Sequence, residues 1–121
     1  MSFSVLSGDL LSPIQNLYNL TSIIFSFNNQ VSSFPPSFGT NLPSLQTLIL
    51  NHVGMTGTIP ESIGKMTSLI SLSLHGNLLE GQIPDVFGNL SLLKFVEMSF
   101  NNLNGSLPVT LSSTNLTLYA F

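Results

Sequence analysis

A spacing of about 24 residues recurs along the whole chain and limits its fold more than any other feature. Five related segments start 24, 25, 24 and 24 residues apart, at 8–15, 32–39, 57–64, 81–88 and 105–112. Apolar-rich segments lie between them at 17–25, 42–50, 66–74 and 90–98, with a shortened copy at 113–121. Such self-similarity predicts a solenoid in which each repeat buries its apolar face only by stacking on its neighbours.

The 121 residues are too few for two ordinary domains, so the pattern predicts one domain of stacked repeats. We expect four full repeats and two partial ones without caps, at 17–41, 42–65, 66–89 and 90–112, and at 1–16 and 113–121. An uncapped end exposes core leucines and an unpaired strand. We therefore interpret the chain as a piece of a longer protein; the alternative is a complete small protein that associates end to end.

The apolar residues of each repeat alternate only in its last part, which predicts a short strand with one face inward. We expect these strands around 22–26, 47–51, 71–75 and 95–99. Their core-facing residues would be Ile23, Phe25, Leu48, Leu50, Leu72, Leu74, Val96 and Met98. Equivalent residues of successive parallel strands then lie side by side.

The other half of each repeat carries a glycine and then an apolar residue followed by proline. Proline lacks an amide donor and fixes φ, so we expect no second strand ladder there but extended backbone and a short 3₁₀ turn. Apolar packing from this side would come from Phe34, Ile59, Ile83 and Leu107, and from Ile14, Phe38, Ile63, Phe87 and Leu111.

An asparagine follows three residues after the second core-facing residue of three strands, at Asn28, Asn77 and Asn101. Its amide can bond main-chain groups left open where the chain leaves the strand, so we expect an asparagine ladder. Val53 takes this place in one repeat. We therefore expect an irregular loop at 52–54.

These motifs resemble the plant-type leucine-rich repeat, whose unit runs LxxLxxLxLxxNxLxGxIPxxLGxL. The resemblance covers essentially the whole chain and is clearest in GMTGTIPESIGKMTSL and NLLEGQIPDVFGNLSLL. It implies an α/β leucine-rich repeat solenoid, with parallel strands on a concave face and extended segments and 3₁₀ turns on the convex side. Such repeats form ectodomains of plant receptor-like kinases and receptor-like proteins, and also polygalacturonase-inhibiting proteins.

The charge content argues against several classes of function. Charged residues make up 6% of the chain, and Lys65 and Lys94 are its only cations. Nucleic-acid binding and polybasic membrane-surface binding are therefore nearly excluded. No apolar stretch approaches the roughly 18 residues of a membrane span, and residues 1–11 lack the basic start of a signal peptide. The chain has no cysteine.

Candidate binding residues are the outward-facing side chains of the strands. We expect a concave ligand-binding face formed by Ser22, Ile24, Ser26, Thr47, Ile49, Asn51, Ser71, Ser73, His75, Phe95, Glu97 and Ser99. Hydroxyl and amide groups dominate it and could bond a peptide main chain, while Ile24 and Ile49, with Phe27, could seat an apolar side chain. Alternatively, these residues are only permitted there by the fold.

Few residues point to catalysis. His52 and His75 from adjacent repeats could share a proton or bind a metal, but without a nearby acid we expect solvated histidines. Glu97 has no second carboxylate beside it for acid–base chemistry, and Asp9, Glu61, Glu80 and Asp85 read as surface charges. Phe27 and Phe100 would form an aromatic rim or pack on the next repeat. We expect no metal, cofactor or catalytic residues.

The leading hypothesis is a non-catalytic recognition module of a plant receptor ectodomain that binds a peptide, a protein or a co-receptor. The alternative is an inhibitor of a secreted cell-wall hydrolase. Both follow from the resemblance, which also implies a location at the cell surface or in the cell wall space. N-glycosylation sequons occur at Asn19, Asn89, Asn104 and Asn115.

Overall fold

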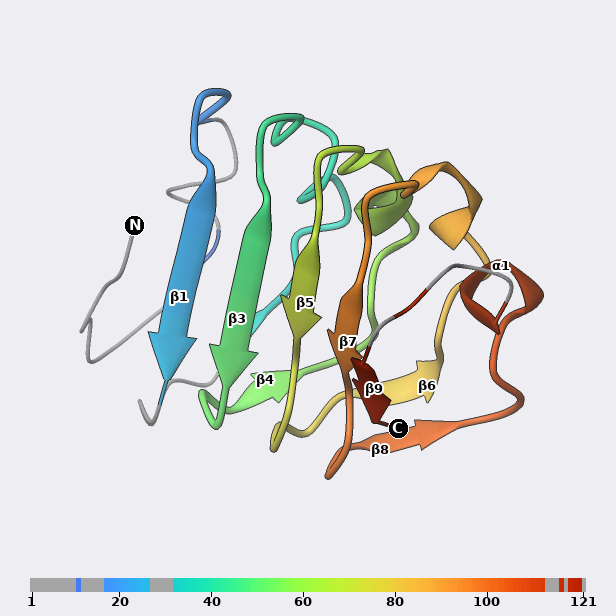
Figure 1. Cartoon of the computed structure of the whole chain (residues 1–121). Coiled ribbons are helices and arrows are strands. Elements are labelled where there is room, and N and C mark those ends of the chain that lie inside the picture. Colours follow the sequence, from blue (N-terminus) through green and yellow to red (C-terminus); the bar gives the residue numbers. More distant parts are fainter. Residues whose placement is uncertain (1–10, 12–16, 27–31, 113–115, 117, 121) are drawn as a thin grey trace.

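Five short parallel strands, stacked one beside the next, form the main sheet of the protein (Figure 1). The computed structural model describes residues 11, 17–26, 32–112, 116 and 118–120. The sheet order is β1-β3-β5-β7-β9, so each strand pairs with the equivalent strand of the next repeat. The strands are β1 (Ser22–Ser26), β3 (Thr47–Asn51), β5 (Ser71–Ser73), β7 (Phe95–Glu97) and β9 (Leu118–Ala120).

Residues on the inner face of this sheet form the core. All eight residues predicted to face inward are at most 2% exposed, from Ile23 in β1 to Met98 just after β7. The burial of β1 and β3 alternates between buried and half-buried residues, as expected for a sheet with one face packed and one open. The solenoid predicted from the repeat spacing is confirmed, and its strands start 23 to 25 residues apart.

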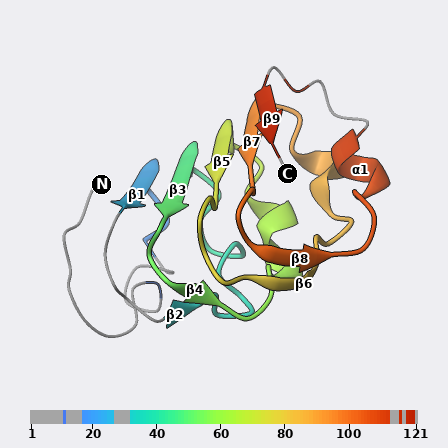
Figure 2. The ribbon, with the colours of Figure 1, turned by 90° about the horizontal axis from the view of Figure 1, so that it is seen from below.

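The opposite side of each repeat carries short strands as well, seen from below in Figure 2. β2 (Ser32–Ser33) pairs with β4 (Met55–Thr56), and β6 (Glu80–Gln82) pairs with β8 (Asn102–Asn104). The prediction that no second ladder forms on this side was wrong. The prolines come at least two residues after each paired segment, so their missing amides do not fall within the ladders.

Short helical turns follow the prolines. η2 (Glu61–Lys65) and η3 (Phe87–Asn89) are 3₁₀ helices, and α1 (Val109–Ser112) is a single α-helical turn. η3 and α1 are joined by a 3.0 Å hydrogen bond from the Phe87 amide to Thr110 Oγ1. The earlier turn at Gly39 is joined to η2 in the same way, by a 3.0 Å bond from the Gly39 amide to Ser62 Oγ. A Cβ at Gly39 would collide with the Ser62 backbone, which explains the glycine at this position.

The turns after the strands are regular. His52, Gly76 and Phe100 take the same place in successive repeats and all have positive φ, of 54°, 73° and 58°. The irregular loop expected from Val53 is therefore limited to Gly54, which has a φ of 75°. Val53 itself is fully buried, so it fills the core where other repeats place an asparagine.

Leu107 departs from the predicted packing. It is 41% exposed, whereas the equivalent Ile59 is 4% exposed and Ile83 is half-buried. The amides of Leu78 and Glu80 bond the carbonyls of Met55 and Gly57, so the repeat of β6 covers the repeat of β4 on this side. Among the described residues, β8 pairs only with β6. Leu107 therefore lies at the edge of this layer. Ile14, which was predicted to pack here too, lies outside the described residues.

Candidate functional site

The outward-facing side chains of β1, β3, β5 and β7 form three rows across the sheet, which we call the concave face. The strand register aligns the upper row, Ser22, Thr47, Ser71 and Phe95, and the middle row, Ile24, Ile49, Ser73 and Glu97. The lower row starts with the paired Ser26 and Asn51 and continues with His75 and Ser99, just beyond the ends of β5 and β7. The register thus brings together the residues predicted to form this face.

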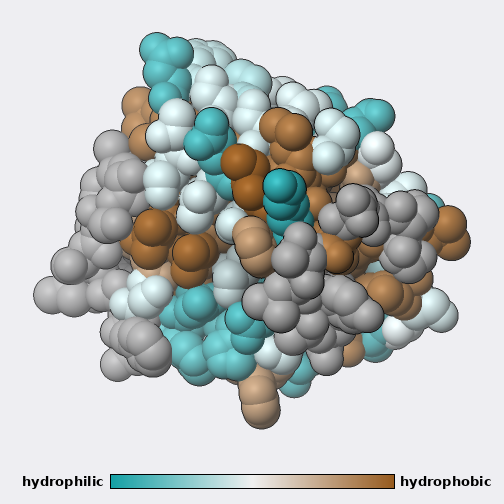
Figure 3. Space-filling view, viewed as in Figure 1, coloured by the Kyte–Doolittle hydropathy of each residue, from teal (hydrophilic) through white to brown (hydrophobic). Residues whose placement is uncertain are grey.

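The middle row is apolar at one end. Ile24 and Ile49 lie opposite one another in β1 and β3, and both are half-buried. The space-filling view shows a hydrophobic patch on the sheet at this place, above a hydrophilic area near the lower ends of the strands (Figure 3). Phe27, which was predicted to extend the patch, lies outside the described residues.

The lower row is tied together by hydrogen bonds. Asn51 Oδ1 accepts bonds from the Ser73 hydroxyl at 2.7 Å and from the His75 amide at 3.0 Å. His75 Nδ1 lies 2.9 Å from Ser99 Oγ and 3.1 Å from Glu97 Oε1. These contacts hold His75 and Glu97 in fixed positions before any ligand arrives.

Three rings line up along the lower edge of the concave face. The ring of His75 makes edge-to-face contacts with His52, at a centroid distance of 4.8 Å, and with Phe100, at 5.2 Å. Phe100 is nonetheless 79% exposed. It therefore packs on the neighbouring repeat and also presents a ring to solvent, which combines the two roles considered from the sequence.

An acid does lie near the histidines, contrary to the prediction from the sequence. It is Glu97, whose Oε1 is 3.1 Å from His75 Nδ1. That expectation was wrong because alignment of the rows does not show how side chains of different rows turn toward one another. His75 lies in the lower row and contacts Glu97 in the middle row of the neighbouring strand. The described residues contain no group of three His, Cys, Asp or Glu side chains that could hold a metal ion.

Asn77 and Asn101 lie behind this edge and bond main-chain groups of two repeats. Asn77 Oδ1 accepts bonds from the Val53 and Met55 amides, both at 3.1 Å, and its Nδ2 donates to the Leu50 and Leu74 carbonyls. Asn101 makes the equivalent bonds one repeat later, accepting from the Leu79 amide and donating to the Leu74 and Met98 carbonyls. Asn28 lies outside the described residues.

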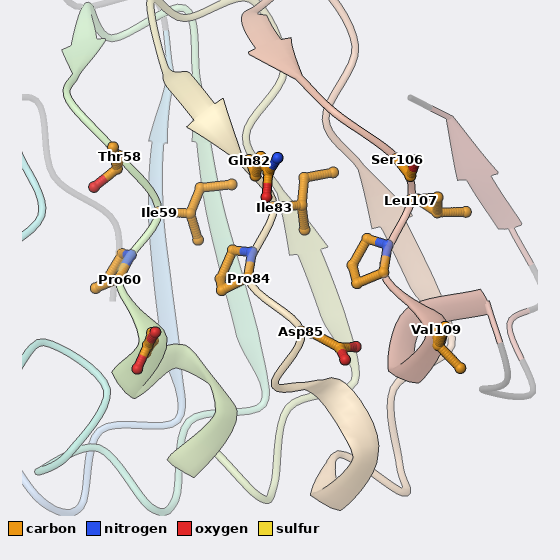
Figure 4. Close-up of a pocket in the computed structure, with 12 residues that line it drawn as sticks. Thr58, Ile59, Pro60, Gln82, Ile83, Pro84, Asp85, Ser106, Leu107 and Val109 are labelled. Atoms are coloured by element: carbon orange, nitrogen blue, oxygen red, sulfur yellow. The ribbon is translucent and has the colours of Figure 1, made fainter.

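A second hollow lies away from the concave face, along the apolar–proline segments (Figure 4). This groove of about 760 Å³ runs past Ile59, Ile83 and Leu107, with Thr58, Gln82 and Ser106 side by side along it. The carboxylate of Asp85 in this groove is already engaged, because Oδ1 accepts bonds from the Thr110 hydroxyl at 2.7 Å and the Thr110 amide at 2.9 Å.

These bonds lower the pKa of Asp85. The side-chain bond from Thr110 has the larger effect, the backbone bond adds to it, and desolvation opposes both. Thr110 Oγ1 also accepts a bond from the Phe87 amide at 3.0 Å. Asp85 therefore acts as a structural link between the turns, which leaves the concave face as the stronger candidate site.

The sequons lie away from the concave rows. Asn19 is exposed in the turn before β1, Asn89 is exposed in η3, and Asn104 is exposed in β8. Asn115 lies outside the described residues. Glycans on the three described asparagines would leave the strand rows open. No helix within the described ranges has the length and apolar character needed to cross a bilayer.

The sequence matches a known family of repeat proteins. The leucine-rich repeat family profile matches residues 43–103. The sequence matches no curated protein.

Solved structures share the fold along nearly all of the chain. The ectodomain of the receptor kinase SOBIR1 from Arabidopsis thaliana is 26% identical, with a TM-score of 0.86, over 99% of this chain and 65% of its own. The plant peptide hormone receptor RGFR1, solved in complex with RGF2, is 34% identical, with a TM-score of 0.84, over 95% of this chain and 18% of its own.

A third similar structure is not described as a receptor. A plant ice-binding protein is 32% identical, with a TM-score of 0.81, over 96% of this chain and 37% of its own. The chain thus spans less than two thirds of each of these three proteins.

Proposed function

The chain belongs to the leucine-rich repeat family, and from this premise we propose that it is a non-catalytic recognition module whose concave face binds a peptide or protein ligand. The observation that carries the proposal is the register of the strands. It aligns small polar side chains with one apolar patch across β1, β3, β5 and β7. Such a track can bond an extended main chain and seat side chains of a partner.

The similar structures support a place for this module in a plant receptor ectodomain. SOBIR1 is a receptor kinase ectodomain, and RGFR1 is a receptor solved with a peptide hormone. The parent of this chain would then be a receptor-like kinase or receptor-like protein, with the repeats on the extracellular side of the plasma membrane. A second receptor chain would be a further partner, as in the solved complex of BIR3 with SERK2.

The width of the five-stranded main sheet fits a short ligand. Parallel strands lie about 4.8 Å apart, so five strands span roughly 20 Å. An extended peptide of around six residues covers this distance at about 3.3 Å per residue.

Paired aspartates on two different surfaces test the proposal. Ile49→Asp with Ser73→Asp places two charges in the middle row, where both residues are half-buried. Thr58→Asp with Ser106→Asp places the same charges in the groove, where both residues are exposed. A peptide array followed by isothermal titration calorimetry should show that the first pair abolishes peptide binding and the second leaves it unchanged.

Three results would contradict the proposal. Equal affinity of the wild type and the Ile49→Asp, Ser73→Asp variant for bound peptides would remove the concave face as the site. Retention of no peptide by the wild type would remove peptide recognition. Inhibition of ice recrystallisation or of a cell-wall hydrolase, without peptide binding, would assign the repeats to one of those functions instead.

A further inference from the structure

The middle row of the concave face has two chemically different ends. Ile24 and Ile49 lie in register at one end, Ser73 follows in β5, and Glu97 lies at the β7 position of the row. The Glu97 side chain is 44% exposed. A ligand on this row therefore meets an apolar surface first and a carboxylate two strands later.

Glu97 is held by its neighbours but keeps binding capacity. Its side-chain contacts among the described residues both involve Oε1, with His75 Nδ1 at 3.1 Å and with the Ser99 hydroxyl at 3.4 Å. A carboxylate has about four acceptor positions on two oxygens. An incoming ammonium or guanidinium group can therefore bond Glu97 without displacing either neighbour.

Phe100 adds a second feature that favours a cation. Its ring is 79% exposed and contacts the same His75 ring that contacts Glu97. An exposed aromatic ring attracts a basic side chain through a cation–π interaction, and a carboxylate attracts one through an ionic interaction, so two neighbours of His75 favour a cation. The protein carries a net charge of −3, which also favours a basic ligand.

The spacing of the row sets the spacing of the ligand side chains. Ile49 and Glu97 are separated by two strand intervals, which is about 10 Å. A polyproline II peptide repeats every three residues and rises about 3.1 Å per residue, so side chains at i and i+3 point the same way about 9 Å apart. A fully extended strand does not match, since its same-side residues are about 7 Å or 13 Å apart.

We propose that the middle row selects a peptide in the polyproline II conformation with an apolar side chain on Ile24 and Ile49 and an arginine or lysine three residues away on Glu97. The proposal rests on the proposed function and deepens it, because it names the chemistry and the spacing of the ligand. His75 acts as a positioning residue that holds Glu97 and supports the Phe100 ring.

Blocked synthetic peptides on a proline scaffold serve as probes. The matched probe, acetyl-PLPPRP-amide, has leucine and arginine three residues apart, and acetyl-PRPPLP-amide has the reverse order. The comparison probes place the arginine two or four residues from the leucine, or replace it with citrulline, which keeps its shape without the charge. Isothermal titration calorimetry measures the dissociation constant of each unlabelled probe with the full chain.

We expect a three-residue spacing, in one of the two orders, to bind about fivefold more tightly than the other spacings and than the citrulline probe. This preference should shrink as salt rises from 50 to 500 mM, because the charged groups are partly exposed. Glu97→Gln should reduce the preference for arginine over citrulline, with the cation–π contribution of Phe100 left in place. Glu61→Gln, which removes the same charge from exposed η2, should keep it.

The outcomes separate this inference from the proposed function. Peptide binding that is lost in Ile49→Asp with Ser73→Asp, but is indifferent to citrulline, spacing and Glu97→Gln, overturns the inference and leaves the recognition module in place. Failure of every peptide to bind the concave face overturns both. The citrulline comparison uses the wild type, so it decides the charge dependence even if Glu97→Gln does not fold.

Discussion

The side-chain nitrogen of Asn77 donates a 2.6 Å hydrogen bond to the carbonyl oxygen of Leu50 and so links two neighbouring repeats. Asn77 is 5% exposed and also accepts bonds from two amides of the earlier repeat. Asn77→Ala leaves these buried groups unsatisfied and should lower the free energy of unfolding by about 3 kcal/mol in urea titrations. Asn101→Ala should cost less, because Asn101 is only half-buried. An equal or smaller loss for Asn77→Ala would contradict this ranking.

Gly76 should be harder to replace than Gly57, although both have a φ near 75°. Alanine at Gly57 meets only the Ser33 Cβ at 3.7 Å, so we expect a cost of about 1 kcal/mol from the backbone alone. A Cβ at Gly76 would collide with the His52 ring and should cost more. In a double-mutant cycle followed by thermal unfolding, His52→Ala should remove the excess. Additive effects of Gly76→Ala and His52→Ala would show that the ring does not cause it.

His52→Gly should stabilise the protein. His52 adopts a φ of 54°, which costs a side-chain-bearing residue roughly 1–2 kcal/mol, while glycine adds back about 0.5–1 kcal/mol of chain entropy. We expect a net gain of about 0.5–1 kcal/mol in chemical denaturation. Phe100→Gly, at a φ of 58°, should change stability in the same direction and serves as the matched variant. A loss of stability in both variants would mean that the ring contacts outweigh the backbone strain.

The link between Asp85 and Thr110 should make stability depend on pH in the acid range. The Thr110 bonds lower the pKa of Asp85 in the folded state, so this link stabilises the fold fully above the ordinary carboxyl range, about pH 4. The contribution is lost as pH falls through the lowered pKa. Thr110→Val should therefore destabilise the protein more at pH 6 than at pH 2 in urea titrations.

The Asp85 carboxyl itself provides the direct measurement. Carbon-detected NMR should show that the pKa of Asp85 rises toward the ordinary carboxyl value in Thr110→Val, because this variant removes the hydroxyl whose bond lowers the pKa. When Thr110→Val is added to Asp85→Asn, the resulting loss in the free energy of unfolding should no longer vary with pH. An unchanged Asp85 titration in Thr110→Val would exclude the hydroxyl as the cause.

The sequence predicts the main sheet well because its periodicity is strong. Every strand segment has apolar residues at its two inward positions, and residues such as Leu48 and Leu72 recur 24 apart, so the strands, their inner face and their stacking order follow from the spacing. The outward-facing rows follow as well, since alternate residues must point the other way. That these rows form a binding site is still a prediction.

Other features could not be read from the sequence because they depend on contacts between repeats. The predicted rows place Glu97 and His75 on neighbouring strands, but the spacing does not show the side-chain orientations that bring Oε1 to 3.1 Å from Nδ1. Likewise, nothing in the residue type of His52 predicts its positive φ. The only signal in the sequence is the glycine at the equivalent turn position, Gly76. The short β6–β8 pair was missed because the prolines were taken to exclude a ladder, although Pro84 begins two residues beyond Gln82.

The ladder asparagines also bear on the order in which the repeats obtain their hydrogen bonds during synthesis. Asn77 completes the turn around Val53, and Asn101 completes the turn around Leu79, so each turn is finished by a residue made 22 to 24 positions later. On the ribosome, a newly emerged repeat keeps unsatisfied amides until its successor follows. The Val53 and Leu79 amides therefore gain these hydrogen bonds only after the following repeat has been synthesised.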